Sequence, residues 1–134
     1  MPGSSLWLLP PSNHPLQSLL TTLIEKTSAH FSSPHLFIPH VTLTSEIKPS
    51  VYGEGDEPQK WLDGLKLPVK GEVVVKLGGL NSEDVFVRKL YSGVRKDGVR
   101  ELGVVARRWV EGFEGEGESR RWAEEQYVPH LSLL

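Results

Sequence analysis

Two short segments of the sequence share one pattern that could support proton transfer and phosphate binding. "FIPHVTL" (residues 37–43) and "YVPHLSL" (127–133) each give an aromatic residue, an aliphatic residue, Pro, His, an aliphatic residue, a hydroxyl residue and Leu. Alternate residues of a strand share a face, so His40 should point with Thr42, and His130 with Ser132. Each segment is therefore predicted to present one imidazole and one hydroxyl together.

Two imidazoles and two hydroxyls at one place suit the hydrolysis of a phosphodiester. Imidazole exchanges protons near neutral pH, so one histidine can activate water while the other protonates the leaving oxygen. Hydroxyls can donate hydrogen bonds to phosphoryl oxygens without adding charge. A packing repeat gives no reason to select His twice, because a buried His needs hydrogen-bond partners. We therefore favour the catalytic interpretation over the structural one, with no metal or cofactor required.

The composition limits the classes of function. The chain has 134 residues, a net charge of −2 and no cysteine. Its length predicts one domain, and its charge argues against long nucleic acid as the partner. Without cysteine there are no disulfides, thiolate metal sites or cysteine nucleophiles. No apolar run is long enough for a membrane span, and the N-terminal segment does not resemble a signal peptide, so we expect a cytoplasmic or other intracellular location.

Hydrophobic periodicity and turn residues predict the elements that would position the paired segments. We expect a buried strand at 5–10, a helix at 15–29 capped by Ser12 or Asn13, and a strand at 36–44. After a loop at 45–60 and a short helix near 58–65, a hairpin of strands 71–77 and 85–94 should follow. A helix from Asp97, with Val99, Leu102, Ala106, Trp109 and Phe113 on one face, then precedes a mobile break at 111–121. A short helix at 119–126 and a strand at 127–134 complete the order. Each half thus ends in a Pro-His strand, which indicates an internal duplication.

Several other residues allow two interpretations each. Trp7 suits either substrate contact or core packing. Phe86 is either a core residue or an aromatic that stacks on a ligand ring, and Tyr127 is expected in the core or at its rim. The histidines at 14, 30, 35 and 40 do not have the spacing of a metal site. A basic set around the hairpin fits a solvated face better than a diphosphate site; its members are Lys76, Arg88, Lys89, Arg95 and Lys96.

The segments "SLWLLPP", "FIPHVTL" and "YVPHLSLL" resemble the two-histidine phosphoesterase superfamily, and within it the 2′,3′-cyclic-nucleotide 3′-phosphodiesterases of plants and fungi. The resemblance implies a bilobal α+β fold, with two antiparallel sheets facing each other across a central cleft, helices outside and a pseudo-two-fold duplication. It also implies that His40 and His130 are catalytic and that Thr42 and Ser132 bind phosphate. We hypothesise that His130 is the base and His40 the acid, although the sequence does not distinguish the two roles.

The resemblance further implies a small cyclic phosphate nucleotide as substrate. Members open ADP-ribose 1″,2″-cyclic phosphate, a by-product downstream of tRNA splicing, to ADP-ribose 1″-phosphate, and convert nucleoside 2′,3′-cyclic phosphates to 2′-phosphates. The alternatives are a relative that acts on RNA ends or 2′–5′ linkages, and a non-catalytic nucleotide-binding module. Relatives continue beyond the second motif, so residues 1–134 are expected to form one bilobal domain without that C-terminal segment. The family also offers Golgi association as an alternative location.

Overall fold

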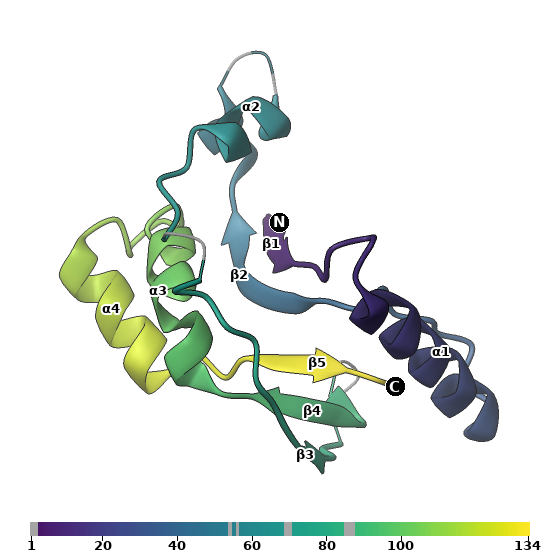
Figure 1. The fold of residues 1–134 in the computed structure, drawn as a ribbon. Coiled ribbons are helices and arrows are strands. Elements are labelled where there is room, and N and C mark those ends of the chain that lie inside the picture. The colour runs from purple at the N-terminus through teal and green to yellow at the C-terminus, as the bar shows by residue number, and fades with distance from the viewer. Residues whose placement is uncertain (1–2, 54, 56, 69–70, 85–87) are drawn as a thin grey trace. The chain divides into compact units, whose positions relative to one another are not determined.

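The computed structural model describes residues 3–53, 55, 57–68, 71–84 and 88–134. Its elements are short and mix helices with strands, as Figure 1 shows. In chain order they are β1 (Ser4–Leu8), α1 (Pro15–His30), β2 (Val41–Ile47), a 3-10 helix (Pro49–Tyr52), α2 (Pro58–Asp63), β3 (Leu77–Asn81), β4 (Tyr91–Val94), α3 (Lys96–Arg107), α4 (Glu116–Glu125) and β5 (His130–Ser132).

The strands form two small antiparallel sheets, which confirms the predicted α+β class. One sheet pairs β1 with β2, and the other has the order β3-β4-β5. The predicted hairpin is present as the antiparallel pair β3–β4, with an irregularity between Leu77 and Leu80. In the pair β4–β5, Gly93 lies opposite His130 and Tyr91 lies opposite Ser132.

The chain divides into two compact units that alternate along the sequence. Unit 1 comprises Met1–Leu6, Leu43–Val75 and Lys96–Tyr127, and unit 2 comprises Trp7–Thr42, Lys76–Arg95 and Val128–Leu134. The boundary therefore falls within β1 and within β2. The three-stranded sheet, both histidines of the paired segments and Trp7 all belong to unit 2.

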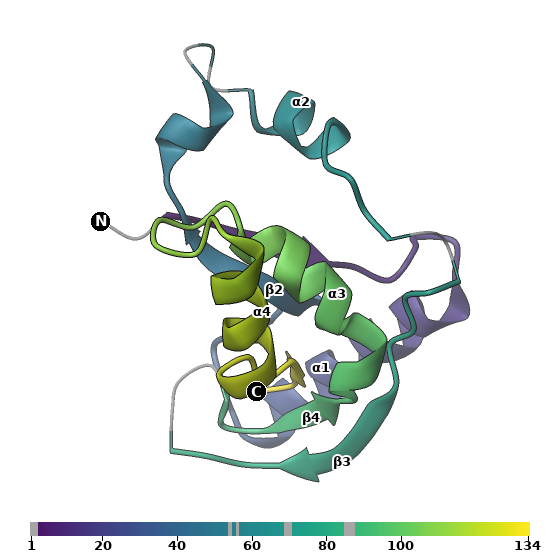
Figure 2. The ribbon, with the colours of Figure 1, turned by 90° about the vertical axis from the view of Figure 1, so that its left-hand side faces the viewer.

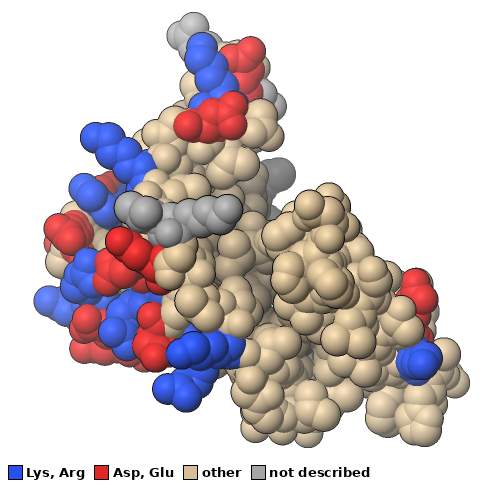
Figure 3. All heavy atoms as spheres, in the orientation of Figure 1, with Lys and Arg blue, Asp and Glu red and all other residues tan. Residues whose placement is uncertain are grey.

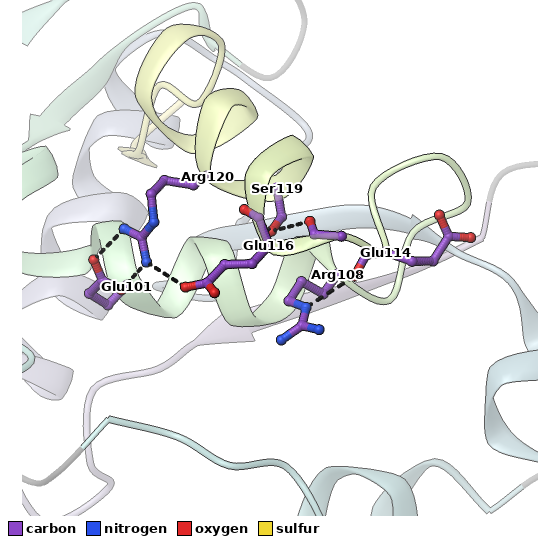
Figure 4. Close-up of polar contacts among 7 residues, drawn as sticks. Glu101, Arg108, Glu114, Glu116, Ser119 and Arg120 are labelled. Atoms are coloured by element: carbon purple, nitrogen blue, oxygen red, sulfur yellow. Dashed lines mark hydrogen bonds and ion pairs between the residues drawn. The ribbon is translucent and has the colours of Figure 1, made fainter.

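Helices α3 and α4 lie side by side in unit 1, as both Figure 1 and Figure 2 show. Val99, Leu102 and Ala106 are buried, which confirms the predicted apolar face of α3 over these positions. A polar network also joins the two helices (Figure 4). Arg120 donates to both carboxylate oxygens of Glu101, at 2.8 and 3.0 Å, and to Glu116 at 3.3 Å. This bidentate geometry is the stronger form of an arginine–carboxylate ion pair.

Arg107 links the end of α3 to β2 inside unit 1. Its guanidinium lies 4.1 Å from the ring centre of Phe113 and 4.5 Å from that of Trp122. Nη1 donates to the hydroxyl of Thr44 at 3.2 Å, and Nη2 lies 3.7 Å from a carboxylate oxygen of Glu46. Burial lowers the pKa of Arg107, and the charge of Glu46 partly offsets this effect. Two aromatic faces and two oxygen partners thus compensate for burying this cation.

Four predictions about the N-terminal half were wrong in detail. The first strand is not buried, since Trp7 is 44% exposed. Helix α1 is capped by His14 rather than Ser12 or Asn13, because the imidazole Nδ1 accepts the amide hydrogen of Leu16. The second strand begins at Val41 and not at 36, and it continues to Ile47. Part of the expected loop at 45–60 is therefore strand or 3-10 helix.

The predicted boundaries in the C-terminal half also need correction. The hairpin's first strand is Leu77–Asn81 rather than 71–77, and its second is only Tyr91–Val94, while 85–87 lie outside the described residues. The last strand is limited to His130–Ser132. These strands are short because pairing partners, and not the apolar runs alone, define where the ladders exist.

The region expected to be a mobile break contains the start of a helix. Helix α3 ends at Arg107, so the predicted face does not extend to Trp109, which is 41% exposed. Gly112 turns the chain with a φ of 93°, a conformation that favours glycine. Helix α4 then starts at Glu116, and Ser119 is fully buried, with its hydroxyl donating to the Gly115 carbonyl at 3.0 Å.

We predict that Arg107→Lys lowers the free energy of unfolding by about 1–2 kcal/mol, because an ammonium group lacks the planar surface that stacks between two rings. Chemical denaturation would measure the change. Arg121→Lys, at an exposed position of α4, is the matched control and should leave stability unchanged. Equal stability of the two variants would contradict the role given to the stacked guanidinium.

Candidate active site

His40 lies immediately before β2 and is held by two contacts. Its ring stacks on Trp7, with centroids 3.8 Å apart and an interplanar angle of 17°. Its Nδ1 lies 2.5 Å from the carbonyl oxygen of Ile38, two positions earlier in the chain. The intervening Pro39 is buried, and a proline ring fixes φ there. The imidazole is therefore held by its own segment and by the neighbouring strand β1.

His130, the first residue of β5, repeats the same local arrangement. Its Nδ1 lies 2.9 Å from the carbonyl oxygen of Val128, again two positions earlier, and Pro129 between them is buried. Its aromatic neighbour is Tyr91 of β4, whose ring meets the imidazole at a centroid distance of 5.4 Å and an angle of 67°. Each Pro-His segment thus ties its imidazole to the backbone in the same way.

These hydrogen bonds fix which ring nitrogen is left for chemistry. A carbonyl oxygen only accepts hydrogen bonds, so Nδ1 of each histidine must carry a hydrogen. In the neutral ring Nε2 is then the bare nitrogen, which can take a proton, and in the charged ring Nε2 can give one away. Both histidines can therefore act as base or as acid through Nε2. The geometry does not separate the two roles.

The two hydroxyl residues lie where strand alternation predicts them. Thr42 is half-buried in β2, and its neighbours Val41 and Leu43 are buried on the other face. Ser132 is buried at the end of β5, between Leu131 and Leu133, which are also buried. Each histidine therefore has a hydroxyl two positions further along its strand and aliphatic anchors behind it.

The predicted site residues form two contact groups, both in unit 2. One consists of Trp7, His40 and Thr42 on the two-stranded sheet. The other consists of His130 and Ser132 on the three-stranded sheet, with Tyr91 added by the structure. Sequence reasoning missed Tyr91, because only the register of β4 against β5 places it opposite Ser132. The one available signal was its position near the end of the predicted return strand.

Three of the remaining candidates from the sequence, Lys96, Arg88 and Tyr127, have partners of their own. Lys96 donates to the carbonyl of Glu124 at 3.1 Å within unit 1, so the basic set does not act as one cluster. Arg88 lies 3.5 Å from the carboxylate of Glu83. Tyr127 is buried and stacks on Trp122, and burial raises the pKa of its hydroxyl. Phe86 lies outside the described residues.

Unit 1 contains a cavity of about 410 Å³ that does not involve the paired segments. Its lining residues are Gly64, Leu65, Lys66, Val105, Arg108, Trp109 and Glu114. On the face shown in Figure 3, basic and acidic side chains alternate over the region of α3 and α4 and do not separate by sign. Neither feature contributes a side chain to the histidine groups.

The two histidine–hydroxyl segments on an α+β fold define a candidate acid–base site of the phosphoesterase kind. The chain belongs to the family of cyclic phosphodiesterase-like proteins, whose model matches residues 1–134. This membership confirms the resemblance seen in the sequence.

Curated relatives from fungi agree with this family. The chain is 55% identical over 135 residues to a 2′,3′-cyclic-nucleotide 3′-phosphodiesterase of Phaeosphaeria nodorum, covering all of this chain and 69% of the relative. It is 37% identical over 154 residues to the protein of that name from Neurospora crassa, covering all of this chain and 71% of the relative. A Candida albicans protein of the same name is 35% identical over 104 residues, covering 71% of this chain and 42% of the relative.

Within the described residues, no helix is long and apolar enough to cross a bilayer.

We predict that His40 and His130, when neutral, carry their hydrogen on Nδ1, because each Nδ1 faces a carbonyl oxygen. His14 is the internal control, since its Nδ1 accepts a hydrogen bond and its hydrogen must therefore be on Nε2. The ¹⁵N shifts of the three rings at high pH would distinguish these tautomers. An Nε2–H form at either His40 or His130 would contradict the geometry.

Proposed function

We propose that this protein is a metal-independent cyclic phosphodiesterase that hydrolyses nucleoside 2′,3′-cyclic phosphates to 2′-phosphates. The observation that carries the proposal is the repeated arrangement of a histidine whose Nδ1 is tied to the backbone and a hydroxyl two positions later. Membership of the cyclic phosphodiesterase-like family and the names of the fungal relatives support it.

The proposed site forms where the two groups of unit 2 converge, with the two sheets facing each other across a cleft. Residues 1–134 then act as one bilobal catalytic domain with a pseudo-two-fold duplication. Convergence is what the chemistry needs, because acid and base must lie on opposite sides of the bond that breaks.

In this mechanism His130 is the base and His40 the acid. Nε2 of neutral His130 takes a proton from water as the water oxygen bonds to phosphorus. The bond between phosphorus and the 3′ oxygen breaks, and the 3′ oxygen takes the proton from Nε2 of charged His40. The products are the 3′ hydroxyl and the 2′-phosphate. Proton exchange with solvent then restores the starting forms of both imidazoles.

Thr42 and Ser132 hold the phosphoryl oxygens in the proposed site. Their hydroxyls donate hydrogen bonds that strengthen as negative charge builds up on those oxygens. Trp7 has two faces, one of which stacks on His40. Because the residue is 44% exposed, the rest of its indole can contact the base or ribose of the substrate.

We also propose ADP-ribose 1″,2″-cyclic phosphate as a substrate of this protein. Its opening to ADP-ribose 1″-phosphate uses the same five-membered cyclic diester and so the same acid and base. The proposed role is the removal of this by-product of tRNA splicing, inside the cell. The chemistry supports this extension because the reacting ring does not change between the two substrates.

One assay separates this proposal from a nucleotide-binding module. The protein would be incubated with adenosine 2′,3′-cyclic phosphate and, separately, with ADP-ribose 1″,2″-cyclic phosphate, each in excess chelator. Turnover to the 2′-phosphate and the 1″-phosphate supports the proposal. Binding without turnover supports the module, and activity that disappears in chelator contradicts the metal-independent mechanism.

We predict that His40→Ala and His130→Ala each lower kcat by about 100- to 10,000-fold, because each removes one proton-transfer group. The far-ultraviolet circular dichroism of both variants should match that of the wild type. His30→Ala is the matched control, since His30 is the last residue of α1 and its ring meets that of Phe31 edge-on. Near wild-type turnover in either test variant would eliminate the two-histidine mechanism.

We also predict that Thr42→Val and Ser132→Ala each lower kcat/KM by about tenfold, the loss expected for one hydrogen bond to the phosphoryl group. Thr27→Val in α1 is the control, because the Thr27 hydroxyl donates to the helix carbonyl of Leu23. Steady-state kinetics on adenosine 2′,3′-cyclic phosphate would measure the effect. Unchanged kcat/KM in both test variants would show that these hydroxyls do not bind the phosphate.

A further inference from the structure

The register of β4 against β5 decides what surrounds His130. Gly93 lies directly opposite His130, and Tyr91 lies directly opposite Ser132. Directly paired residues of antiparallel strands share a face, so Tyr91, Gly93, His130 and Ser132 all lie on one face of the sheet. The burial pattern of β4 agrees, because Ser92 and Val94 are buried while Tyr91 and Gly93 are only partly buried.

Tyr91 is fixed at both ends of its side chain. Its ring meets the imidazole of His130 at 5.4 Å in an edge-to-face arrangement, which is the diagonal cross-strand contact that an aromatic residue can reach. Its hydroxyl donates to a carboxylate oxygen of Glu83 at 2.8 Å. This bond to Glu83 raises the pKa of Tyr91 above its ordinary value.

Glu83 is itself held in place by Arg88. The amide of Glu83 donates to the carbonyl of Arg88 at 2.9 Å, and Nη1 of Arg88 lies 3.5 Å from the same carboxylate oxygen that Tyr91 contacts. Tyr91 therefore contacts the Glu83 carboxylate through its hydroxyl and the imidazole of His130 through its ring. The ring packs against one side of that imidazole.

The residue directly opposite His130 on β4 is Gly93, which has no side chain. A Cβ built on Gly93 would have only one heavy atom within 4 Å, the amide nitrogen of Asn81 at 3.9 Å. The φ of Gly93 is not positive, so the backbone there does not require glycine. Neither the surroundings of this Cβ nor the backbone conformation therefore requires glycine at position 93, so its presence opposite His130 needs another explanation.

We propose that Tyr91 is a positioning residue for His130 and that Gly93, directly opposite His130 on β4, keeps the space over that part of the sheet face open for the substrate. The Val128 carbonyl determines which nitrogen of the His130 ring carries the hydrogen. The Tyr91 ring fixes the orientation of the imidazole and therefore the direction of Nε2. The nucleoside part of the substrate then lies over Gly93. This inference rests on the proposed function, in which His130 is one of the two proton-transfer groups.

The first test compares Tyr91→Ala and Tyr91→Leu with Tyr91→Phe. Removing the flat ring should lower kcat about 10- to 100-fold with little change in KM, because a misplaced Nε2 affects the reaction more than binding. Tyr91→Phe keeps the ring and should restore most of kcat. Tyr52→Ala is the matched control, since Tyr52 makes the same edge-to-face contact at 5.4 Å, but with Trp61 in unit 1.

A spectroscopic readout keeps this test independent of activity. In Tyr91→Ala and Tyr91→Leu the ¹⁵N shifts of His130 should move towards the averaged values of a free histidine, while those of His40 stay unchanged. If the wild type hydrolyses no cyclic phosphate, the proposed function fails, and the His130 shifts still test the positioning role. Unchanged kcat together with unchanged His130 shifts in both variants would overturn that role.

The second test uses Gly93→Val to fill the space at the position opposite His130. Valine is favoured in strands, so a purely structural role for this position predicts equal or higher stability and unchanged kinetics. The proposal predicts retained stability with KM for adenosine 2′,3′-cyclic phosphate raised about tenfold or more. Leu80→Val is the control, because Leu80 pairs with Ser92 on the other face. Wild-type KM in Gly93→Val would overturn the substrate path over Gly93.

Discussion

The antiparallel register of β4 with β5 is the constraint on which the second half of the site depends. It places Gly93 opposite His130 and Tyr91 opposite Ser132. A shift by one residue would turn Ser92 and Val94, now buried, to the histidine face and would turn Tyr91 away from it. The apolar residues behind the strand therefore fix the register, and the register in turn fixes the neighbours of the imidazole.

The two Pro-His segments reach the same local geometry with different neighbours. In both, a buried proline precedes the histidine, and Nδ1 bonds the carbonyl two positions back. This contact spans three residues, so it depends mainly on the segment itself. The aromatic partner does not, because His40 stacks on Trp7 of β1 while His130 meets Tyr91 of β4 edge-on. The two segments share the hydrogen bond between Nδ1 and the backbone carbonyl, and they differ in the aromatic residue that the imidazole contacts.

Periodicity predicted the long elements well and the short ones poorly. The predicted helix at 15–29 corresponds to Pro15–His30, and the apolar face of α3 is buried at Val99, Leu102 and Ala106. Residues 78–81 of β3 were predicted to lie in the turn between strands 71–77 and 85–94, because "GGLN" has low intrinsic strand preference. This segment becomes a strand through its ladder with β4, where Gly78 allows close approach to the backbone of Gly93.

The sequence by itself determined the chemistry that this chain can offer and the family to which it belongs. The residue types, their alternation within a strand and the proline before each histidine are properties of seven consecutive positions, so they can be recognised without any long-range contact. Only the tertiary structure decided that Tyr91 contacts His130, that Gly93 pairs with it across the sheet, that Trp7 stacks on His40 and that Arg107 packs against two aromatic rings. Those contacts join residues far apart in the chain, and their pairing follows from the register of strands and the packing of helices, which periodicity within one segment does not encode.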